Sequence, residues 1–312
     1  MEIYVPDYYK DFSCIASKCE HTCCEGWEID IDDKTLKSYK NLQTDFGKRL
    51  IENIKEDNGF SHFILKKEDR CPFLNEDNLC DIILNLGENY LCQICSDHPR
   101  FRNFFSSRTE IGIGLCCEEA ARIILTNKQK VKLAKISSFD NTQVSDGDEE
   151  IFFNFRSSLI KEIQDRDISI RKRIFNIVSK YKISFPYNTP KEWADFFLSL
   201  EQLNSGWNEM LSSIGNDEGA LLSNSAFEIQ AEQLLVYFIF RHLADGLYEG
   251  DLKERIAFSL LCVMMIDYVL SGLLKKQGVI DINDIIEISR LYSSEIEYSE
   301  ENIKTILSAL KI

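Results

Sequence analysis

Proline and glycine are scarce in this chain, with 5 prolines and 14 glycines among 312 residues. Collagen-like repeats need glycine at every third position, and low-complexity linkers are rich in both residues. The scarcity excludes both classes and leaves little room for long disordered tracts. No internal repeat of fixed period is visible, which argues against a solenoid or a propeller. The length and the apolar fraction of 44% fit a globular chain of one large domain or two ordinary ones.

Basic side chains are too few to balance the acidic ones. Lys and Arg number 36 against 51 Asp and Glu, so the formal net charge is −15 at pH 7. Binding to nucleic acid or to an anionic membrane requires clustered basic side chains that neutralise phosphates. The sequence therefore predicts no nucleic-acid partner. An acidic surface would suit a basic partner, although it also serves simply to keep a protein soluble.

Long apolar runs are missing as well. The longest, 258–274, has 17 residues and includes Asp267, whereas a membrane-spanning helix needs about 20 apolar residues. We expect a buried core helix there and no membrane association. The first residues, MEIYVPDYYKDF, have neither a cationic flank nor an apolar stretch, so no secretory signal is predicted. These absences predict a cytoplasmic protein, in which thiols stay reduced.

Cysteine, by contrast, is abundant and unevenly distributed. Of the 11 cysteines, only Cys262 lies beyond residue 117. An odd total fits a full disulfide framework poorly, and a reducing compartment disfavours disulfides. Clustered thiols in such a chain indicate metal ligands or redox groups, because thiolates are soft ligands that select zinc, Cu(I) or iron–sulfur clusters. Cys262 lies inside the apolar run and is expected to be a core residue.

The other ten cysteines form short-spaced groups of the kind that metal sites use. A structural zinc needs four tetrahedral ligands, and a four-iron cluster also takes four thiolates. The irregular intervals and the adjacent pairs favour an iron–sulfur cluster over zinc, and ten thiols leave room for two centres. The groups are Cys14, Cys19, Cys23 and Cys24; Cys71 and Cys80; Cys92 and Cys95; and Cys116 and Cys117.

The composition changes near residue 126, and we place a domain boundary at about 140. The sequence predicts a mainly α protein. A small cysteine-rich, metal-binding N-terminal domain with short strands would occupy residues 1–140, and an all-α helical bundle that binds a substrate or partner would occupy 141–312. Apolar residues at helical spacing in the second part predict its helices. Their expected spans are 149–182, 190–213, 225–247, 251–276, 282–293 and 299–311.

Local patterns in the first part predict short elements. Alternation over 27–32 predicts a strand, and Asp32 or Asp33 would cap a helix that runs to about Lys55. A second strand is expected at 62–65. The polar group 75–78 predicts a turn that brings Cys71 and Cys80 close together. Gly87 is expected to end a helix, and 116–130 is expected to form another.

Three segments resemble the flagellin lysine-N-methylase family, which shares its cysteine core with a wider group of small zinc- or iron-chelating proteins. The segments are FSCIASKCEHTCCEGWEIDID, CPFLNEDNLCDIILNLGENYLCQICSDHPRF and IGLCCEEAARIIL. The resemblance covers about residues 4–126, and the remainder is similar in length and helical character. Where the family usually has Cys-Pro-Glu, this chain has Cys117-Glu118-Glu119. The family's cysteine positions fall on Cys14, Cys19, Cys23, Cys24, Cys71, Cys80, Cys95 and Cys117, with Cys92 and Cys116 as additional thiols.

The resemblance implies a protein-lysine N-methyltransferase that transfers a methyl group from S-adenosylmethionine to flagellin or another lysine-bearing protein. It also implies a cysteine-ligated centre, either an iron–sulfur cluster of the 4Fe-4S type or zinc. Two alternatives stay open on the sequence. One is a non-enzymatic iron–sulfur or zinc module with a helical partner-binding domain. The other is an electron-transfer or redox-sensing protein.

A few polar residues and glycines are candidates for the chemistry. His98 can be a metal ligand, a hydrogen-bond partner of a ligand, a surface residue or a catalytic base, and Asp97 is a second candidate base. Arg100 can clamp the carboxylate of the methyl donor or form a surface ion pair. No GxGxxG follows a strand. Gly112 and Gly114 are the nearest candidates for the donor site, although such glycines more often form a tight turn.

Overall fold

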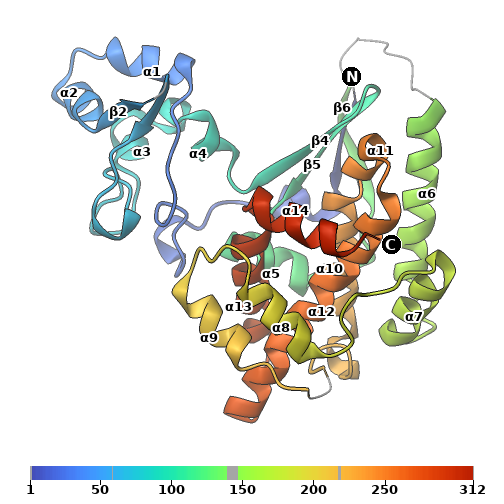
Figure 1. Cartoon of the computed structure of the whole chain (residues 1–312). Coiled ribbons are helices and arrows are strands. Elements are labelled where there is room, and N and C mark those ends of the chain that lie inside the picture. Colours follow the sequence, from blue (N-terminus) through green and yellow to red (C-terminus); the bar gives the residue numbers. More distant parts are fainter. Residues whose placement is uncertain (1, 58, 139–146, 217–218, 312) are drawn as a thin grey trace. The chain divides into compact units, whose positions relative to one another are not determined.

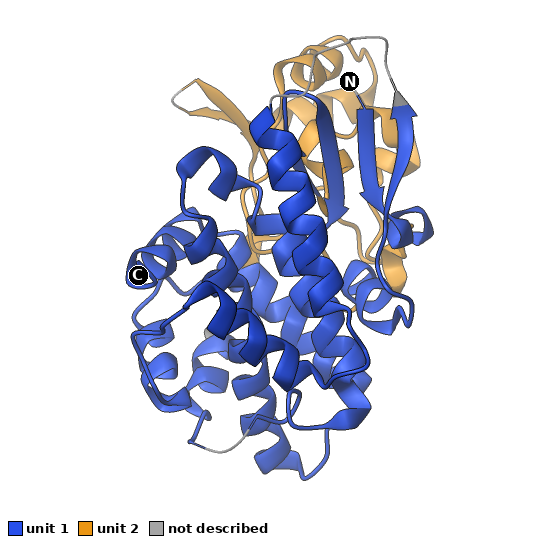
Figure 2. Cartoon of the chain, turned by 90° about the vertical axis from the view of Figure 1, so that its right-hand side faces the viewer, with its two compact units in different colours: residues 1–12, 101–312 blue, residues 13–100 orange. Residues whose placement is uncertain are grey.

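The structure is a computed structural model that describes residues 2–57, 59–138, 147–216 and 219–311 (Figure 1). The chain divides into two compact units (Figure 2). We call Ser13–Arg100 the cysteine-rich unit, and Met1–Phe12 together with Phe101–Ile312 the helical unit. The boundary expected at about 140 lies outside the described residues. The compact units divide elsewhere, at 12/13 and 100/101, because the first strand pairs with strands that follow residue 107.

A four-stranded sheet in the helical unit was not expected from the sequence. Its order is β4-β5-β1-β6, with β1 parallel to β5 and antiparallel to β6. The sequence RTEIGI of β5 hides the strand, because Glu110 is fully buried where the alternating pattern would call for an apolar side chain. The strands are β1 Glu2–Pro6, β4 Arg100–Phe104, β5 Arg108–Ile113 and β6 Leu133–Ser138.

Glu110 is buried together with two arginines. It accepts hydrogen bonds from Arg108 on its own strand and from Arg156 on helix α6 (Gly147–Ile163). The Arg156 guanidinium also lies 5.1 Å from the centre of the Phe152 ring. A buried ion pair stabilises little by itself, but removing one partner is costly. The pair therefore fixes α6 against the sheet.

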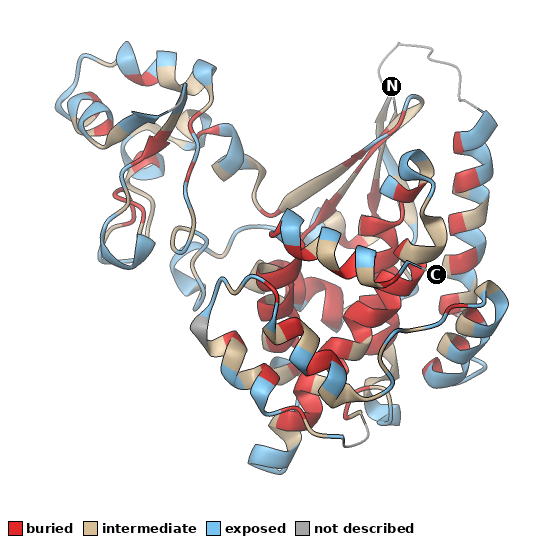
Figure 3. Cartoon of the chain, in the orientation of Figure 1, coloured by how far each residue is buried: buried red, intermediate tan, exposed pale blue. Residues whose placement is uncertain are grey.

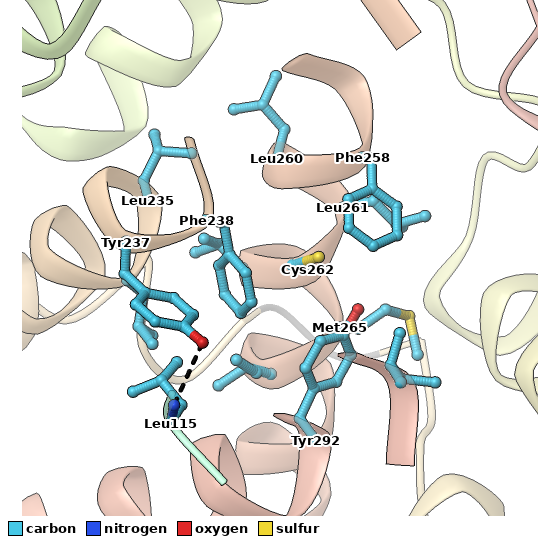
Figure 4. Close-up of a cluster of buried hydrophobic side chains, with 14 of the residues drawn as sticks. Leu115, Leu235, Tyr237, Phe238, Phe258, Leu260, Leu261, Cys262, Met265 and Tyr292 are labelled. Atoms are coloured by element: carbon cyan, nitrogen blue, oxygen red, sulfur yellow. Dashed lines mark hydrogen bonds between the residues drawn. The ribbon is translucent and has the colours of Figure 1, made fainter. Parts of the chain in front are cut away.

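The core of the helical unit centres on α10 (Glu228–His242) and α12 (Leu252–Gln277), which pack against each other. Figure 3 shows buried residues concentrated on these two helices. Side chains of both helices meet Tyr292, whose ring packs edge-on against Phe238 at 5.9 Å (Figure 4). Cys262 on α12 is fully buried, as the sequence predicts.

Helix α12 confirms the core helix expected at 258–274. Among the described residues it is the one helix long and apolar enough to cross a membrane by length and composition, yet 83% of its apolar window is buried inside the protein. Buried core helices of soluble proteins pass the same test. The apolar run is thus explained by packing within the helical unit.

The remaining helices confirm the mainly α fold class but are shorter than the sequence predicts. The span 149–182 is two helices, of which one ends at Ile163 and the next begins at Ile170, and the span 190–213 is two helices because Asn204 caps the second. Thr189 and Glu192 form a capping box, and the Asn204 side chain accepts from the amide of Gly206. The helices are α5 Glu118–Thr126, α7 Ile170–Tyr181, α8 Pro190–Leu198, α9 Ser205–Ser212, α11 Asp245–Glu249, α13 Ile282–Tyr292 and α14 Glu300–Ala309.

The cysteine-rich unit is built from short elements. The strand predicted at 27–32 is wrong, since this segment makes a single bridge between Asp30 and His62. The helix predicted to run to Lys55 is two helices, because Thr44 caps a new one by accepting from the Gly47 amide. The cap at Asp32 is confirmed by its bond from the Thr35 amide. The elements are α1 Asp33–Lys40, α2 Asp45–Glu52, β2 Ile54–Asp57, β3 Phe60–Phe63, α3 Asp81–Leu86 and α4 Gln93–Asp97.

This unit has its own apolar core. Phe63 packs edge-on against Phe73 at 5.0 Å, and the buried Tyr39 donates a hydrogen bond of 2.6 Å to the Tyr90 carbonyl. Gly87 ends α3 with φ of 90°, which confirms the predicted helix end. The core is small, and cysteine side chains belong to it. A metal would add cross-links that such a small unit otherwise lacks.

We predict that Asp267 makes the helical unit less stable as the pH rises. Burial raises the pKa of Asp267 to about 6, against two amides, of Leu221 and Leu222, that favour its charged form. Because the pKa is raised in the folded state, protonated Asp267 contributes about 3 kcal/mol to the stability of the unit below about pH 4. This contribution is lost as the pH rises through 6. Asp267→Asn, which cannot ionise, should therefore gain thermal stability over wild type between pH 4 and 7.

The control is Asp267→Ala, which removes the acceptor of both amides and should be less stable than Asp267→Asn at every pH. Thermal unfolding followed by circular dichroism across pH 4–7 measures both variants. A constant difference between Asp267→Asn and wild type over this range would contradict the prediction.

Candidate metal and polar sites

Five thiols of the cysteine-rich unit share one apolar core. Cys71 and Cys92 are buried, and Cys24, Cys80 and Cys95 pack against the same core in half-buried positions. Soft thiolate donors gathered from separate segments are the ligand set of zinc and of iron–sulfur clusters. All five are candidates from the sequence, and Cys92, which matches the family pattern less closely than the others, lies among them.

Turns and backbone pairing bring these thiols together. The turn predicted at 75–78 is present, since the Asn75 side chain accepts from the amides of Asp77 and Leu79 and a bridge joins Leu74 to Cys80. The Cys71 amide donates a hydrogen bond of 2.8 Å to the Cys24 carbonyl. The first cysteine run is thereby tied to the second at the point where both supply a thiol.

The thiols interact electrostatically at short range. The Sγ atoms of Cys92 and Cys95 are 3.3 Å apart. A hydrogen bond from Cys23 holds the pKa of Cys24 at about 7, although burial opposes ionisation. Burial, together with the charges of Cys24 and Cys80, raises the pKa of Cys71 to about 12. Several thiolates can therefore coexist here only if a cation compensates their charge, as a bound metal does.

The other cysteines of this unit are more accessible. Cys14 and Cys23 are exposed, and Cys19 is half-buried, with its thiol donating to the His21 carbonyl at 3.1 Å. Trp27 donates its ring N–H to the Cys23 carbonyl at 2.8 Å. The contacts within the unit place these thiols outside the buried core that the other five share. They remain candidate ligands from the sequence.

The polar residues that follow Cys95 lie on and after α4. The Asp97 carboxylate accepts from Gln93 at 2.6 Å, and Arg100 donates to the Ser96 carbonyl. The ring of His98 stacks on Trp27 with centroids 6.4 Å apart. Burial lowers the pKa of His98 to about 4, and its shielded Nε2 has no hydrogen-bond partner within the described part of the chain. His98 is therefore neutral at pH 7, and burial leaves its Nε2 without a hydrogen bond within the described residues.

Cys116, Cys117 and the two candidate glycines lie in the helical unit. Gly112 is in β5, where a Cβ would collide with the Phe101 ring at 2.2 Å, so its role in the structure is close packing. The Gly114 carbonyl accepts from the amide of Cys117, the residue that precedes α5. The Cys116 thiol donates to the Tyr298 hydroxyl at 3.0 Å, and burial raises the pKa of Cys116 to about 12.

Sequence analysis missed a buried polar network in the helical unit. Glu297 is fully buried on its side chain and is the acceptor at its centre. It accepts from Tyr237 at 2.9 Å, pairs with Arg241 at 3.1 Å and lies 2.6 Å from the Nε2 of His242. Burial opposes ionisation of Glu297, yet Arg241 and His242 hold its pKa below the usual range. Tyr237 also accepts from the Leu115 amide (Figure 4).

Glu297 ends a five-residue π-helix, Ser293–Glu297, between α13 and α14. Such wide turns are rare and occur frequently at functional sites. Charged residues beside an apolar helical run, as in FIFRH before residue 243, were the available signal in the sequence. The network joins α10 to the segment that leads into Cys116, and it holds a charge pair where water is excluded.

We predict that the five core thiols hold metal. Replacing both Cys71 and Cys95 by Ala should lower the bound metal per chain at least severalfold, because the three core thiolates that remain make an incomplete site. Cys262→Ala is the matched control, since Cys262 is a buried thiol of the other unit and should keep full metal content. Metal per chain, measured by mass spectrometry after anaerobic purification, tests this. Wild-type content in the variant with both Cys71→Ala and Cys95→Ala would contradict it.

We predict that Glu297→Gln destabilises the helical unit by about 3–5 kcal/mol, because Arg241 is left as a buried charge without its carboxylate. Tyr237→Phe is the control. It removes one hydroxyl and keeps the ion pair, so it should cost only about 1–3 kcal/mol. Urea unfolding monitored by fluorescence gives both values. Equal losses in the two variants would show that the charge pair is not the central element.

Comparison with known proteins gives related sequences. The chain is 29% identical over 152 residues to the flagellar biosynthetic protein FliU of Salmonella muenchen. The aligned part is 45% of this chain and 86% of that protein. It is 28% identical over 151 residues to proteins named Lysine-N-methylase from Salmonella choleraesuis and Salmonella typhimurium. These matches cover 44% of this chain but 36% of the Lysine-N-methylases, so the chain spans about a third of their length. No solved structure matches the chain.

The family comparison concerns the helical unit. The family of the FliB lysine N-methylase C-terminal domain matches residues 100–312. This part includes residues 127–312, whose resemblance to the family lay only in length and helical character. It contains Cys116, Cys117 and the Glu297 network. Because the match covers more than half of the chain, the chain belongs to the FliB lysine N-methylase family.

Proposed function

We propose that this chain methylates lysine side chains of flagellin, or of another lysine-bearing protein, with S-adenosylmethionine as the methyl donor. The observation that carries the proposal is the family match over residues 100–312. The Lysine-N-methylase names of two relatives support it, and the FliU relative is named for flagellar biosynthesis.

The chemistry makes definite demands on the protein. A lysine ammonium has a pKa of about 10.4, so the amine must lose its proton before it is nucleophilic. Its lone pair then attacks the sulfonium methyl, the carbon–sulfur bond of the donor breaks, and S-adenosylhomocysteine leaves. The protein contributes mainly by holding amine and methyl in line and by excluding water. His98, a candidate base from the sequence, suits this task poorly, because burial lowers its pKa to about 4 and shields its Nε2, whereas a general base works best with a pKa near the working pH.

We also propose that the cysteine-rich unit holds an iron–sulfur cluster or, as the alternative, zinc. The donor set fits either group, because Cys24, Cys71, Cys80, Cys92 and Cys95 offer at least four thiolates from one core. The sulfurs of Cys92 and Cys95 lie 3.3 Å apart, closer than the roughly 3.8 Å that tetrahedral Zn–S bonds of about 2.3 Å set between two ligands, so a small side-chain movement would let both bind one ion. When bound, the group would cross-link the unit or, as iron, offer an open site to the donor.

We predict that the full chain, purified without oxygen, transfers labelled methyl groups to lysines of flagellin. Incubation with labelled S-adenosylmethionine and mass spectrometry of the flagellin lysines measure the transfer. A variant with Cys71→Ala and Cys95→Ala is the metal-free comparison, and Cys262→Ala is the matched control that keeps activity. No label on flagellin or on other bacterial protein, with metal content intact, would overturn the enzyme proposal and favour a non-enzymatic metal-binding module.

The same preparation distinguishes the metals. Absorbance near 400 nm together with iron and acid-labile sulfide supports an iron–sulfur cluster. Zinc without iron or colour overturns that assignment and leaves a structural zinc, which does not absorb in this range because its d shell is full. Chains with neither metal would overturn the metal-centre proposal as a whole.

A further inference from the structure

A second group of metal-binding side chains lies in the cysteine-rich unit and is made of oxygen and nitrogen donors. Glu28, Asp30 and His62 each offer one ligand atom, and the three atoms lie within 4.8 Å of one another. His62 is nine-tenths buried, and Asp30 and Glu28 are exposed. None of the three belongs to the thiol set, and neither the family nor the relatives' names account for them.

The backbone holds Asp30 and His62 side by side. They form an isolated antiparallel bridge, flanked by hydrogen bonds from the Ile31 amide to Ser61 at 2.7 Å and from the Phe63 amide to Ile29 at 3.1 Å. In this pattern the two bridged residues are the non-hydrogen-bonded pair, whose side chains lie closest together on one face. Their separation is therefore set by the strand pairing rather than by chance contact of mobile side chains.

The same alternation separates this group from the core. The ligand atom of Glu28 lies within 4.8 Å of those of Asp30 and His62, so Glu28 joins the same face. Ile29 and Phe63 point to the opposite face and are each 1% exposed in the core that contains the thiols. One face of the pairing thus supplies apolar packing, and the other supplies an imidazole and two carboxylates.

The imidazole of His62 makes no hydrogen bond to the Glu28 carboxylate. Its Nε2 lies 3.7 Å from that carboxylate, which is beyond hydrogen-bond reach. Lys55 pairs with His62 across the β2–β3 ladder, but its ammonium lies 3.3 Å from Asp57 and is itself largely exposed. The lysine is thus partnered elsewhere on its own strand, and two carboxylates face one buried imidazole ring.

We propose that Glu28, Asp30 and His62 bind a divalent cation of the Mn²⁺, Fe²⁺ or Zn²⁺ class. Two carboxylates and a neutral imidazole match the charge and the donor preference of such ions, and the set lacks the soft donors that Cu(I) selects. Ligand bonds of about 2.0–2.2 Å require the three atoms to close in by roughly 1 Å. The two exposed carboxylates can make that movement by rotation of their side chains.

The cation would fasten the segment that follows Cys23 and Cys24 to strand β3. A single bridge now joins this segment to the hairpin. Coordination from both sides would add a second link between them and so steady the position of Cys24 in the thiol core. The proposal is independent of methyl transfer, since it concerns the fold of the cysteine-rich unit alone.

The test is a Mn²⁺ titration of the full-length chain, with free Mn²⁺ followed by electron paramagnetic resonance. Mn²⁺ is chosen because it prefers oxygen and nitrogen donors and competes poorly for thiolates. Wild type should show one saturable site, and His62→Gln and Asp30→Asn should each weaken it at least tenfold. Glu76→Gln, an exposed glutamate in the 75–78 turn, is the matched control and should bind as wild type does.

Hydrogen exchange provides a readout that does not depend on the variants folding alike. Mn²⁺ should slow exchange in wild-type peptides that contain the Ile31 and Phe63 amides, and it should leave peptides of α12 unchanged. Absence of a saturable site below about 1 mM would overturn the proposal. So would unaltered Mn²⁺ binding in both His62→Gln and Asp30→Asn, or binding that is lost equally in Glu76→Gln.

Discussion

The pairing of β1 between β5 and β6 is the constraint on which the organisation of the chain depends. It ties residues 2–6 to strands more than a hundred residues away, and it makes the cysteine-rich unit an insertion within the helical unit. Strand pairing of this kind closes a long loop, so the two ends of the inserted segment must be brought together before the sheet is complete. The helical unit is consequently discontinuous in sequence, although it forms one core.

The sequence predicts the helical content well because it is a property of local periodicity. Helix α12 and the buried Cys262 follow directly from an apolar run, and the caps at Asp32 and Gly87 follow from residue type. The sheet could not be predicted in this way. Its Glu110 is buried with Arg108 of the same strand and with Arg156 from a distant helix, and no local pattern predicts the second partner. The strand predicted at 27–32 does not form, because alternation of apolar and acidic residues alone does not provide a neighbouring strand with which to form a hydrogen-bonded ladder.

The candidate sites show the same division. Spacing and residue type identify the thiols, but which of them share a core depends on the turn at 75–78 and on the pairing of the Cys71 amide with Cys24. The Glu297 network brings α10 and the π-helix together across 55–60 residues of sequence, and its members are ordinary residue types. The Asp30–His62 bridge could not be predicted from the sequence either, because it depends on which segment of the chain lies opposite each residue.

The π-helix at Ser293–Glu297 has a consequence for helical register. Each residue turns an α-helix by about 100°, so a wide turn changes the direction of every side chain that follows it. Glu297 meets Tyr237, Arg241 and His242 only in the register that the wide turn creates. Removal of one residue from this turn would restore an ordinary helix and rotate the carboxylate away from its three partners. The length of this segment is therefore as strictly determined as the identity of its glutamate.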